Sequence, residues 1–181
     1  AACEYECYAS DISRTFPVNG KFSPEQKALY QVILDAQIAA IEAIQIGQSY
    51  KAPHVIAVRI LVEGLVKLGI MQGDVDQIIA DEGYRQFYMH GTGHWLGMDV
   101  HDVGAYKNEA GEPRLFEQGM AITVEPGLYI APDDETVNVK WRGIGIRIED
   151  DVIATEKGPL VLTKNVVKSI EDIEALMANS L

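Results

Sequence analysis

Cysteine is scarce in this chain. Only two of its 181 residues are cysteines, Cys3 and Cys7, and they lie in the segment CEYECYASDISRTF, which we expect to be extended. On a straight strand their Cα atoms would lie about 13 Å apart, at ~3.3 Å per residue, which is too far for a disulfide. Two reduced thiols are typical of a cytoplasmic protein, and we expect that location.

Long apolar runs and excess positive charge are also missing. No run approaches the length of a membrane span, and the first residues lack the charged and then apolar pattern of a signal segment, so we expect no membrane partner. The 15 basic residues are outnumbered by 27 acidic residues, which gives a formal charge of -12. Such a charge repels phosphate backbones and argues against nucleic acid as a partner.

The residues that are present suffice for one folded domain. Hydrophobic residues make up 48% of the chain and charged residues 23%, a composition that supplies a core and differs from that of disordered chains. No linker, low-complexity tract or charge block divides the sequence. We therefore expect residues 1–181 to form a single domain.

Helices are predicted in the first half of the chain, after two strands and a turn in residues 1–20. The clearest helix start has Ser23 as the cap and Pro24 at the first helical position. Apolar spacing of about 3.6 residues then predicts three helices, over residues 23–47, over residues 53–69 and over a short segment after Asp74.

From Phe87 onward the pattern changes to strands and glycine turns. The segments MAITVEPGLYI (residues 120–130) and GIGIRIEDDVIAT (residues 143–155) are the clearest strands, and SIEDIEALM (residues 169–177) predicts a closing helix. Strands, then helices, then strands favour an α+β domain with helices on one face of a curved sheet.

Three of the four histidines lie within HGTGHWLGMDVHD, residues 90–102, interleaved with glycines. A histidine pair on a helix would indicate zinc, but that motif needs a helix and a glutamate after the first histidine. This segment is too rich in glycine for a helix and lacks that glutamate. Its histidines therefore need another explanation.

Acidic residues in strand patterns provide one. Alternation in GIGIRIED places three isoleucines on one face and Arg147 and Glu149 on the other, where the intervening glycines leave room for a cavity. Glu125 and Asp11 also lie in strand-like segments. Each alone could sit at an edge, in solvent or beside an arginine. Together they suggest bound divalent cations, because burying an unpaired carboxylate costs several kcal/mol.

Four motifs, in order, resemble a known family: SDISRTFPVNGKF, GTGHWLGMDVHD, TVEPGLYI and GIGIRIEDD. They are similar to the dinuclear metallopeptidases of the pita-bread fold and, within them, to the bacterial Xaa-Pro aminopeptidases (aminopeptidase P). The similarity covers essentially the whole chain. It implies the pita-bread (creatinase/aminopeptidase) fold, a curved antiparallel sheet with helices on its outer face.

The resemblance also implies a cofactor of two divalent metal ions. Mn²⁺ suits the oxygen-rich set of ligands best, with Co²⁺, Fe²⁺ or Zn²⁺ as other occupants. The family has five metal ligands, and the match places four of them at Asp11, His94, Glu125 and Glu149.

The fifth ligand of the family, an aspartate, falls on the position immediately before Ala1. The resemblance therefore implies a carboxy-terminal fragment of the catalytic domain, without the first strands and helices of the fold and without the upstream amino-terminal domain. With one carboxylate fewer for two cations, we expect metal binding and activity of this chain alone to be weak or absent. We also expect the missing strands to expose an apolar edge, which favours self-association.

The implied activity is an aminopeptidase that releases the N-terminal residue from peptides with proline in second position, through attack by a metal-bridged hydroxide, in an enzyme expected to be a homo-oligomer. Glu125 would also relay a proton to the leaving nitrogen. His101 would hydrogen-bond the developing oxyanion, and His90 would hold the residue after the cut. Arg147 either orients the metal carboxylates or contacts substrate, and Tyr129 either lines the pocket or packs.

Two other functions stay open at this point. A prolidase would cut only Xaa-Pro dipeptides with the same metals, and a non-catalytic pita-bread module would only bind peptides or partner proteins. The four ligand residues and both accessory histidines argue against the second. His54, on the second predicted helix, is expected to be structural or solvent-facing.

Overall fold

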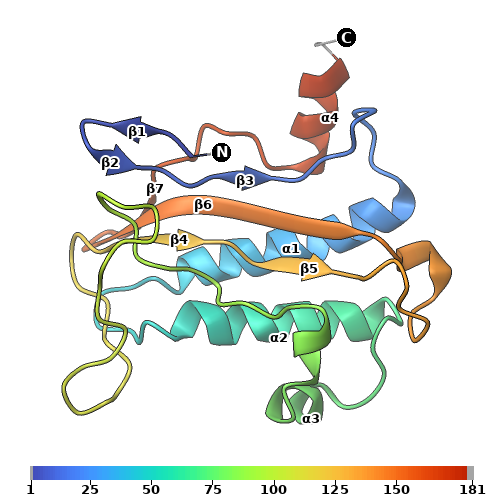
Figure 1. Cartoon of the computed structure of the whole chain (residues 1–181), viewed down its shortest axis with the longest axis horizontal. Helices are drawn as coiled ribbons and strands as arrows, with labels where there is room; N and C mark the ends of the chain where they lie inside the picture. Colours follow the sequence, from blue (N-terminus) through green and yellow to red (C-terminus); the bar gives the residue numbers. More distant parts are fainter. Residues whose placement is uncertain (1, 179–181) are drawn as a thin grey trace.

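The centre of the fold is one long strand, β6 (Gly145–Thr155), which runs along the sheet (Figure 1). The computed structural model describes residues 2–178. Among these residues β6 pairs, always antiparallel, with β3 (Ser13–Arg14), β4 (Ala121–Val124), β5 (Gly127–Tyr129) and β7 (Gly158–Val161). β4 and β5 follow one another along one edge of β6, and β3 lies along the other edge (Figure 1).

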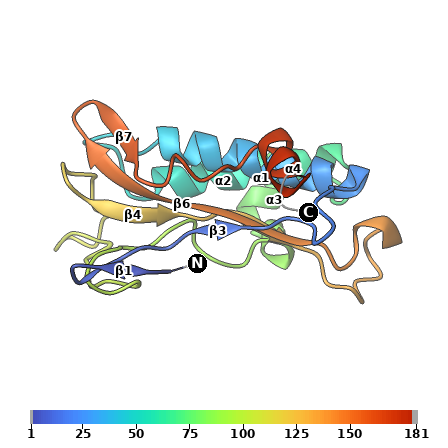
Figure 2. The same ribbon diagram turned by 90° about the horizontal axis from the view of Figure 1, so that it is seen from above.

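Two long helices, α1 (Pro24–Glu42) and α2 (Ala52–Lys67), lie together on one face of this sheet. Figure 2 shows them on one side of β6, with the hairpin of β1 (Glu4–Tyr5) and β2 (Tyr8–Ala9) on the other. The α+β architecture with helices on one face of an antiparallel sheet, as predicted, is confirmed.

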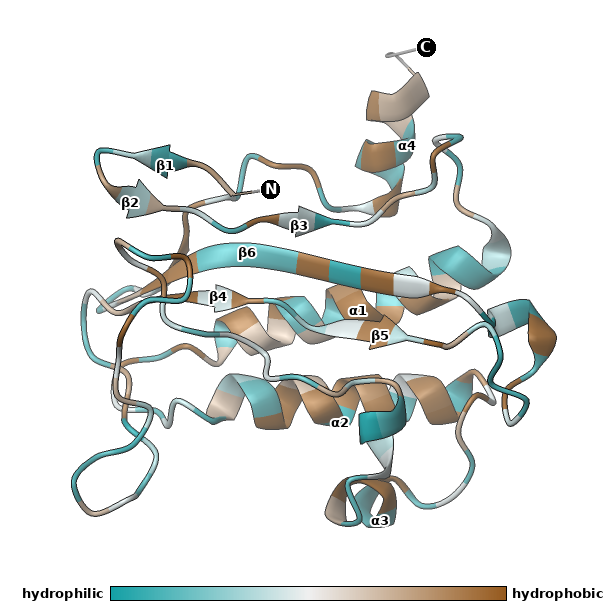
Figure 3. Ribbon diagram, in the orientation of Figure 1, coloured by the Kyte–Doolittle hydropathy of each residue, from teal (hydrophilic) through white to brown (hydrophobic). Residues whose placement is uncertain are grey.

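Apolar residues join the two layers. Figure 3 shows hydrophobic and hydrophilic bands alternating along part of β6, and Ile146 and Ile148 are buried on the helix side. The helices approach closely where Gly64 of α2 faces Val32 of α1, because a Cβ on that glycine would lie 2.3 Å from Val32 Cγ1. Because the core holds these isoleucines on the helix side, the side chains that alternate with them along β6 point to the opposite face of the sheet.

The start of α1 agrees with the prediction, and its end does not. The Ser23 hydroxyl accepts the Gln26 N–H, and the Gln26 side chain accepts the Ser23 N–H, so the helix begins with a capping box. The helix ends at Glu42 rather than at residue 47. Ile44 keeps the apolar spacing and is fully buried, but the backbone has already turned out of the helix.

Two strand predictions also need correction. Residues 120–130 form two strands, because the chain leaves the ladder at Glu125 and Pro126, between β4 and β5. Cys3 and Cys7 do not lie on one straight strand, because Glu6 and Cys7 form the turn of the β1–β2 hairpin with positive φ angles of 49° and 68°. Both thiols are free and exposed.

The remaining elements are short. They are α3 (Val75–Ala80), which begins at the predicted cap Asp74, α4 (Ile170–Ala178), and two single turns of 3₁₀ helix, Gly83–Gln86 and Val139–Trp141. None of the helices in the described part of the chain has the length and apolar character needed to cross a membrane.

Candidate metal centre

The histidine-rich loop is held against the edge of β4. The Thr92 carbonyl accepts the Glu125 N–H at 2.7 Å, and the His94 carbonyl accepts the Thr123 N–H at 3.0 Å. The approach is so close that a Cβ on Gly93 would lie 1.9 Å from the Thr123 carbonyl oxygen. Glycine at this position therefore lets the loop lie beside the strand, so that His94 and Glu125 face the same place.

Four segments bring the four predicted metal ligands together. His94 Nε2 lies 3.7 Å from Asp11 Oδ2 and 3.6 Å from Glu125 Oε1. Ligand atoms of His94, Glu125 and Glu149 lie within 4.8 Å of one another, and so do those of Asp11, His94 and His101. Both groups share His94, so Asp11, His94, Glu125 and Glu149 form one converging cluster, which we call the ligand cluster, and His101 lies beside it.

The His94 ring is oriented as a ligand. Its Nδ1 lies 2.9 Å from the Trp95 carbonyl oxygen, which can only accept a hydrogen bond. Nδ1 therefore carries the hydrogen, and in the neutral ring Nε2 presents its lone pair to the carboxylates. A backbone carbonyl that fixes the other ring nitrogen is typical of metal-binding histidines.

The carboxylates of the ligand cluster have little positive charge beside them. Burial and, after it, the negative charge of Glu149 raise the pKa of Glu125 to about 7, against the opposing effect of Arg147. The Arg147 contact is long, 3.4 Å from Nη1 to Glu125 Oε2. Burial also raises the pKa of Glu149, although the Ser13 hydroxyl donates to its Oε2 at 2.6 Å. Oxygen donors plus one imidazole, short of positive charge, fit a divalent cation.

A hydrogen-bonded chain supports the other predicted site residues. His90 Nδ1 donates to the Gly91 carbonyl at 2.7 Å, which leaves Nε2 to accept the Tyr129 hydroxyl at 2.9 Å. The same hydroxyl accepts Arg147 Nε–H at 2.8 Å. Both ring nitrogens of His90 therefore have partners, and Tyr129 joins His90 to Arg147.

His101 lies differently from His90. It is exposed, and its ring centre lies 4.3 Å from that of His94 in an edge-on contact. It is therefore the accessory histidine nearer to the ligand cluster and open to a bound molecule.

A cavity beside the ligand cluster is lined by Arg147 but not by Glu149. Arg147 and Tyr129 line an open cavity of about 430 Å³, together with Gly145 and residues 12–15 of the chain. Glu149 does not project into it. Its exposed fraction is 2%, because the Ser13 hydroxyl and the surrounding chain enclose it.

Sequence reasoning missed two residues beside the ligands. Ser13 donates to Glu149, and Asp151 accepts the Asp11 N–H at 3.2 Å. Burial raises the pKa of Asp151 to about 6. Each lies two positions after a predicted ligand, so alternation along an extended chain, applied to Asp11 and Glu149, could have found both.

Comparison with known proteins gives concordant results. The model of metallopeptidase family M24 matches residues 1–156. Curated Xaa-Pro aminopeptidases of Haemophilus influenzae and Escherichia coli are each 54% identical to this chain over 177 residues, 98% of this chain and 40% of each relative.

Solved structures agree with this match. The aminopeptidase PepP of Pseudomonas aeruginosa is 59% identical, with a TM-score of 0.96 over 98% of this chain and 40% of that chain. A structure described as zinc-substituted Escherichia coli aminopeptidase P in complex with product is 53% identical, with a TM-score of 0.93 over 99% of this chain and 40% of that one. The chain thus spans about 40% of the length of the relatives it matches.

Proposed function

The chain belongs to metallopeptidase family M24, and from that premise we propose that the whole protein is a metal-dependent aminopeptidase that releases the N-terminal residue from peptides with proline in second position. The observation that carries this proposal is the ligand cluster, in which the Nε2 lone pair of His94 faces the carboxylates of Asp11 and Glu125 at 3.6–3.7 Å. The choice of substrate is supported by relatives named Xaa-Pro aminopeptidase at 54% identity.

In this proposal each residue has a defined task. Divalent cations held by Asp11, His94, Glu125 and Glu149 would polarise the scissile carbonyl as Lewis acids and activate a water. Glu125 would take a proton from the attacking water and pass it to the leaving proline nitrogen, and Arg147, whose Nη1 lies 3.4 Å from Glu125 Oε2, would orient that carboxylate. His101, exposed beside His94, donates a hydrogen bond to the carbonyl oxygen as negative charge develops on it. His90, braced by Tyr129, forms the wall for the residue after the cut.

The proposal also covers the native metal, the cellular compartment and the assembly of the protein. Three carboxylates and one imidazole favour Mn²⁺ as the native metal. The free, exposed thiols of Cys3 and Cys7 suit a reducing compartment such as the cytoplasm. Exposed apolar side chains on the β1–β2 hairpin, Tyr5 at 77% and Tyr8 at 65%, suit an assembly of several copies.

The test is a substrate comparison on the protein at its full encoded length. Purified protein with Mn²⁺ is assayed on an Xaa-Pro-Xaa tripeptide, an Xaa-Pro dipeptide and an Xaa-Ala-Xaa control, with His94→Ala as the ligand-deficient variant. We expect cleavage of the tripeptide before proline, little cleavage of the control, and loss of activity in His94→Ala. Cleavage of the dipeptide alone would indicate a prolidase. A protein that binds no metal and cleaves none of the peptides would be a binding module, and the proposal would be wrong.

A further inference from the structure

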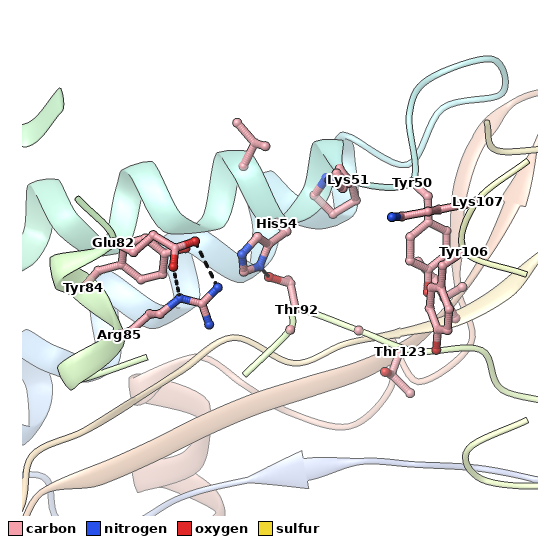
Figure 4. Close-up of a pocket in the computed structure, with 15 residues that line it drawn as sticks. Tyr50, Lys51, His54, Glu82, Tyr84, Arg85, Thr92, Tyr106, Lys107 and Thr123 are labelled. Atoms are coloured by element: carbon pink, nitrogen blue, oxygen red, sulfur yellow. Dashed lines mark hydrogen bonds and ion pairs between the residues drawn. The ribbon is translucent and has the colours of Figure 1, made fainter. Parts of the chain in front are cut away.

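A buried threonine lies behind the histidine loop, on the side of the helices. Thr92 is 4% exposed, and its hydroxyl oxygen lies 2.6 Å from the Tyr88 hydroxyl and 2.8 Å from His54 Nδ1. Figure 4 shows His54 reaching from α2 toward Thr92, with the dashed line joining the two side chains. His54 is thus the contact through which α2 reaches this loop.

The directions of these hydrogen bonds follow from burial. Tyr88 is 1% exposed, and within the described residues Thr92 is the only hydrogen-bond partner that its hydroxyl has. A buried O–H without an acceptor is costly, so Tyr88 donates and Thr92 accepts. Thr92 must then donate its own hydrogen to His54 Nδ1, which requires a neutral imidazole. Burial lowers the pKa of His54, and the charge of Arg85 lowers it further, in agreement with a neutral ring.

Thr92 is also tied to two predicted metal ligands. Its carbonyl accepts the Glu125 N–H at 2.7 Å, and His94 is only two residues further along the chain. Residues 88–94 have no helical or strand structure of their own, so the two backbone hydrogen bonds to Thr123 and Glu125 and the side-chain contacts of Thr92 hold them. A shift of the Thr92 backbone would therefore change the position of the Glu125 amide and of His94 together.

We propose that His54 is a positioning residue for the ligand cluster: by accepting the Thr92 hydroxyl it fixes the loop that carries His94 and the amide of Glu125. The consequence for catalysis rests on the proposed aminopeptidase function. The consequence for metal binding does not. His54 touches neither substrate nor metal, and acts only through Thr92.

The surroundings of His54 make this role testable. A cavity of about 570 Å³ lies on this side of the loop, lined by His54, Thr92 and residues of the α2 start (Figure 4). Removing the imidazole side chain would extend this cavity, so free imidazole in solution could enter and replace it. Val55, the next residue on α2, lines the same cavity, is 61% exposed, and provides a matched control.

The experiment compares variants in the protein at its full encoded length. His54→Leu removes the acceptor and fills the space, His54→Asn keeps an acceptor at the position of Nδ1, and Val55→Ala is the control. Three readouts are taken: the visible spectrum and affinity of bound Co²⁺, hydrogen exchange of the Glu125 amide, and kcat and KM on an Xaa-Pro-Xaa peptide. We expect His54→Leu to lose about tenfold in Co²⁺ affinity and in kcat, with KM nearly unchanged and faster exchange at Glu125. His54→Asn and Val55→Ala should remain close to the unmodified protein.

Chemical rescue separates positioning from general stability. Imidazole should restore His54→Ala toward the unmodified protein measured at the same imidazole concentration, but should not restore His54→Leu or Thr92→Val. The proposal is overturned if His54→Leu, folded by circular dichroism, keeps the Co²⁺ affinity and the Glu125 exchange rate of the unmodified protein, or if His54→Asn is as impaired as His54→Leu. If the unmodified protein cleaves no Xaa-Pro peptide, the proposed function fails, while the Co²⁺ and exchange readouts still decide the role of His54.

Discussion

Neighbouring acidic residues on β6 have opposite surroundings on its two faces. Asp150 faces the helices, is fully buried, and accepts hydrogen bonds at 2.7 Å from both Arg14 and Lys168. Glu149 and Asp151, each 2% exposed, face the ligand cluster, and within the described residues neither has an ion pair with lysine or arginine. Arg14 and Lys168, from other segments of the chain, supply positive charge to the helix face of β6, and the face of the ligand cluster is short of it.

The pKa values express the same contrast. Burial alone would raise the pKa of Asp150, but hydrogen bonds from Lys168, Thr163 and Arg14 lower it below the ordinary value. Burial raises the pKa of Glu149 and Asp151, and nothing of comparable strength opposes it. These three carboxylates are buried to a similar extent. Asp150 belongs to a structural ion network on the helix face, whereas Glu149 and Asp151 lie in a site that needs added cations.

The largest expected effect concerns the helix face. Asp150→Asn would leave Arg14 and Lys168 partly buried beside a neutral group, so we expect the free energy of unfolding to fall by about 3–5 kcal/mol. Urea denaturation followed by circular dichroism measures it. Glu156→Gln, at an exposed position after the end of β6, is the control and should change stability by less than about 0.5 kcal/mol. A loss below about 1 kcal/mol for Asp150→Asn would show that the two faces do not differ in this way.

The pH dependence of the metal-free chain tests the other face. The folded-state pKa values of Glu125, about 7, and Asp151, about 6, lie above those of free carboxyl groups at about 4. The folded state then binds more protons than the unfolded state between about pH 4 and pH 7, so at about 1.4 kcal/mol per pKa unit stability should fall by about 4 kcal/mol as the pH rises from 5 to 8. Denaturation in chelator at pH 5 and pH 8 measures the change. A rise in stability over this interval would contradict the account. Asp150, with its lowered pKa, loses its contribution only below this range.

A smaller effect, on metal affinity, is expected when the Ser13 hydroxyl beside the ligand cluster is removed. Ser13→Ala removes the hydroxyl that donates to Glu149 Oε2 at 2.6 Å, and outer-shell donors of this kind are worth about tenfold or more in metal affinity. Calorimetric titration with Mn²⁺ gives the affinity. Ser10→Ala changes the same type of residue on the same segment, where the hydroxyl bonds the Cys3 backbone, and should leave the affinity unchanged. Equal affinities for both variants would remove Ser13 from the site.

The smallest effect has the opposite sign to the first. In the metal-free chain Glu149→Gln removes a buried carboxylate without a cation partner, and should raise the free energy of unfolding by about 1 kcal/mol. In the protein at its full encoded length, the same variant should lose the stabilisation that Mn²⁺ gives the unmodified protein. Thermal denaturation without Mn²⁺ measures the first effect, and denaturation with Mn²⁺ measures the second. Destabilisation without metal would mean that the protein already satisfies this carboxylate.

The residues that sequence predicted well are those governed by local rules. The α1 cap at Ser23 and the alternation of β6 follow from spacing along the chain, whereas the four ligand positions were assigned through the family resemblance. Ser13 and Asp151 follow the same two-residue alternation and could have been predicted from it. The end of α1 was missed because Ile44 is buried by tertiary packing, which repeats the helical spacing without a helix.

Other features depend on contacts between distant segments. Arg14 bonds Asp150, the Glu149 carbonyl, and the Val166 and Val167 carbonyls, over separations of more than 130 residues. A basic residue in a strand pattern does not reveal which buried acid it will meet. For the same reason His54 was expected to be structural or solvent-facing, and only the fold places it against Thr92.

The most direct measurement is an anomalous difference map from crystals of the protein grown with Mn²⁺. The account predicts a peak coordinated at roughly 2 Å by Asp11, His94, Glu125 and Glu149, with no peak beside Asp150. Full Mn²⁺ saturation in solution with no peak among these four residues, or with the metal held elsewhere, would contradict it.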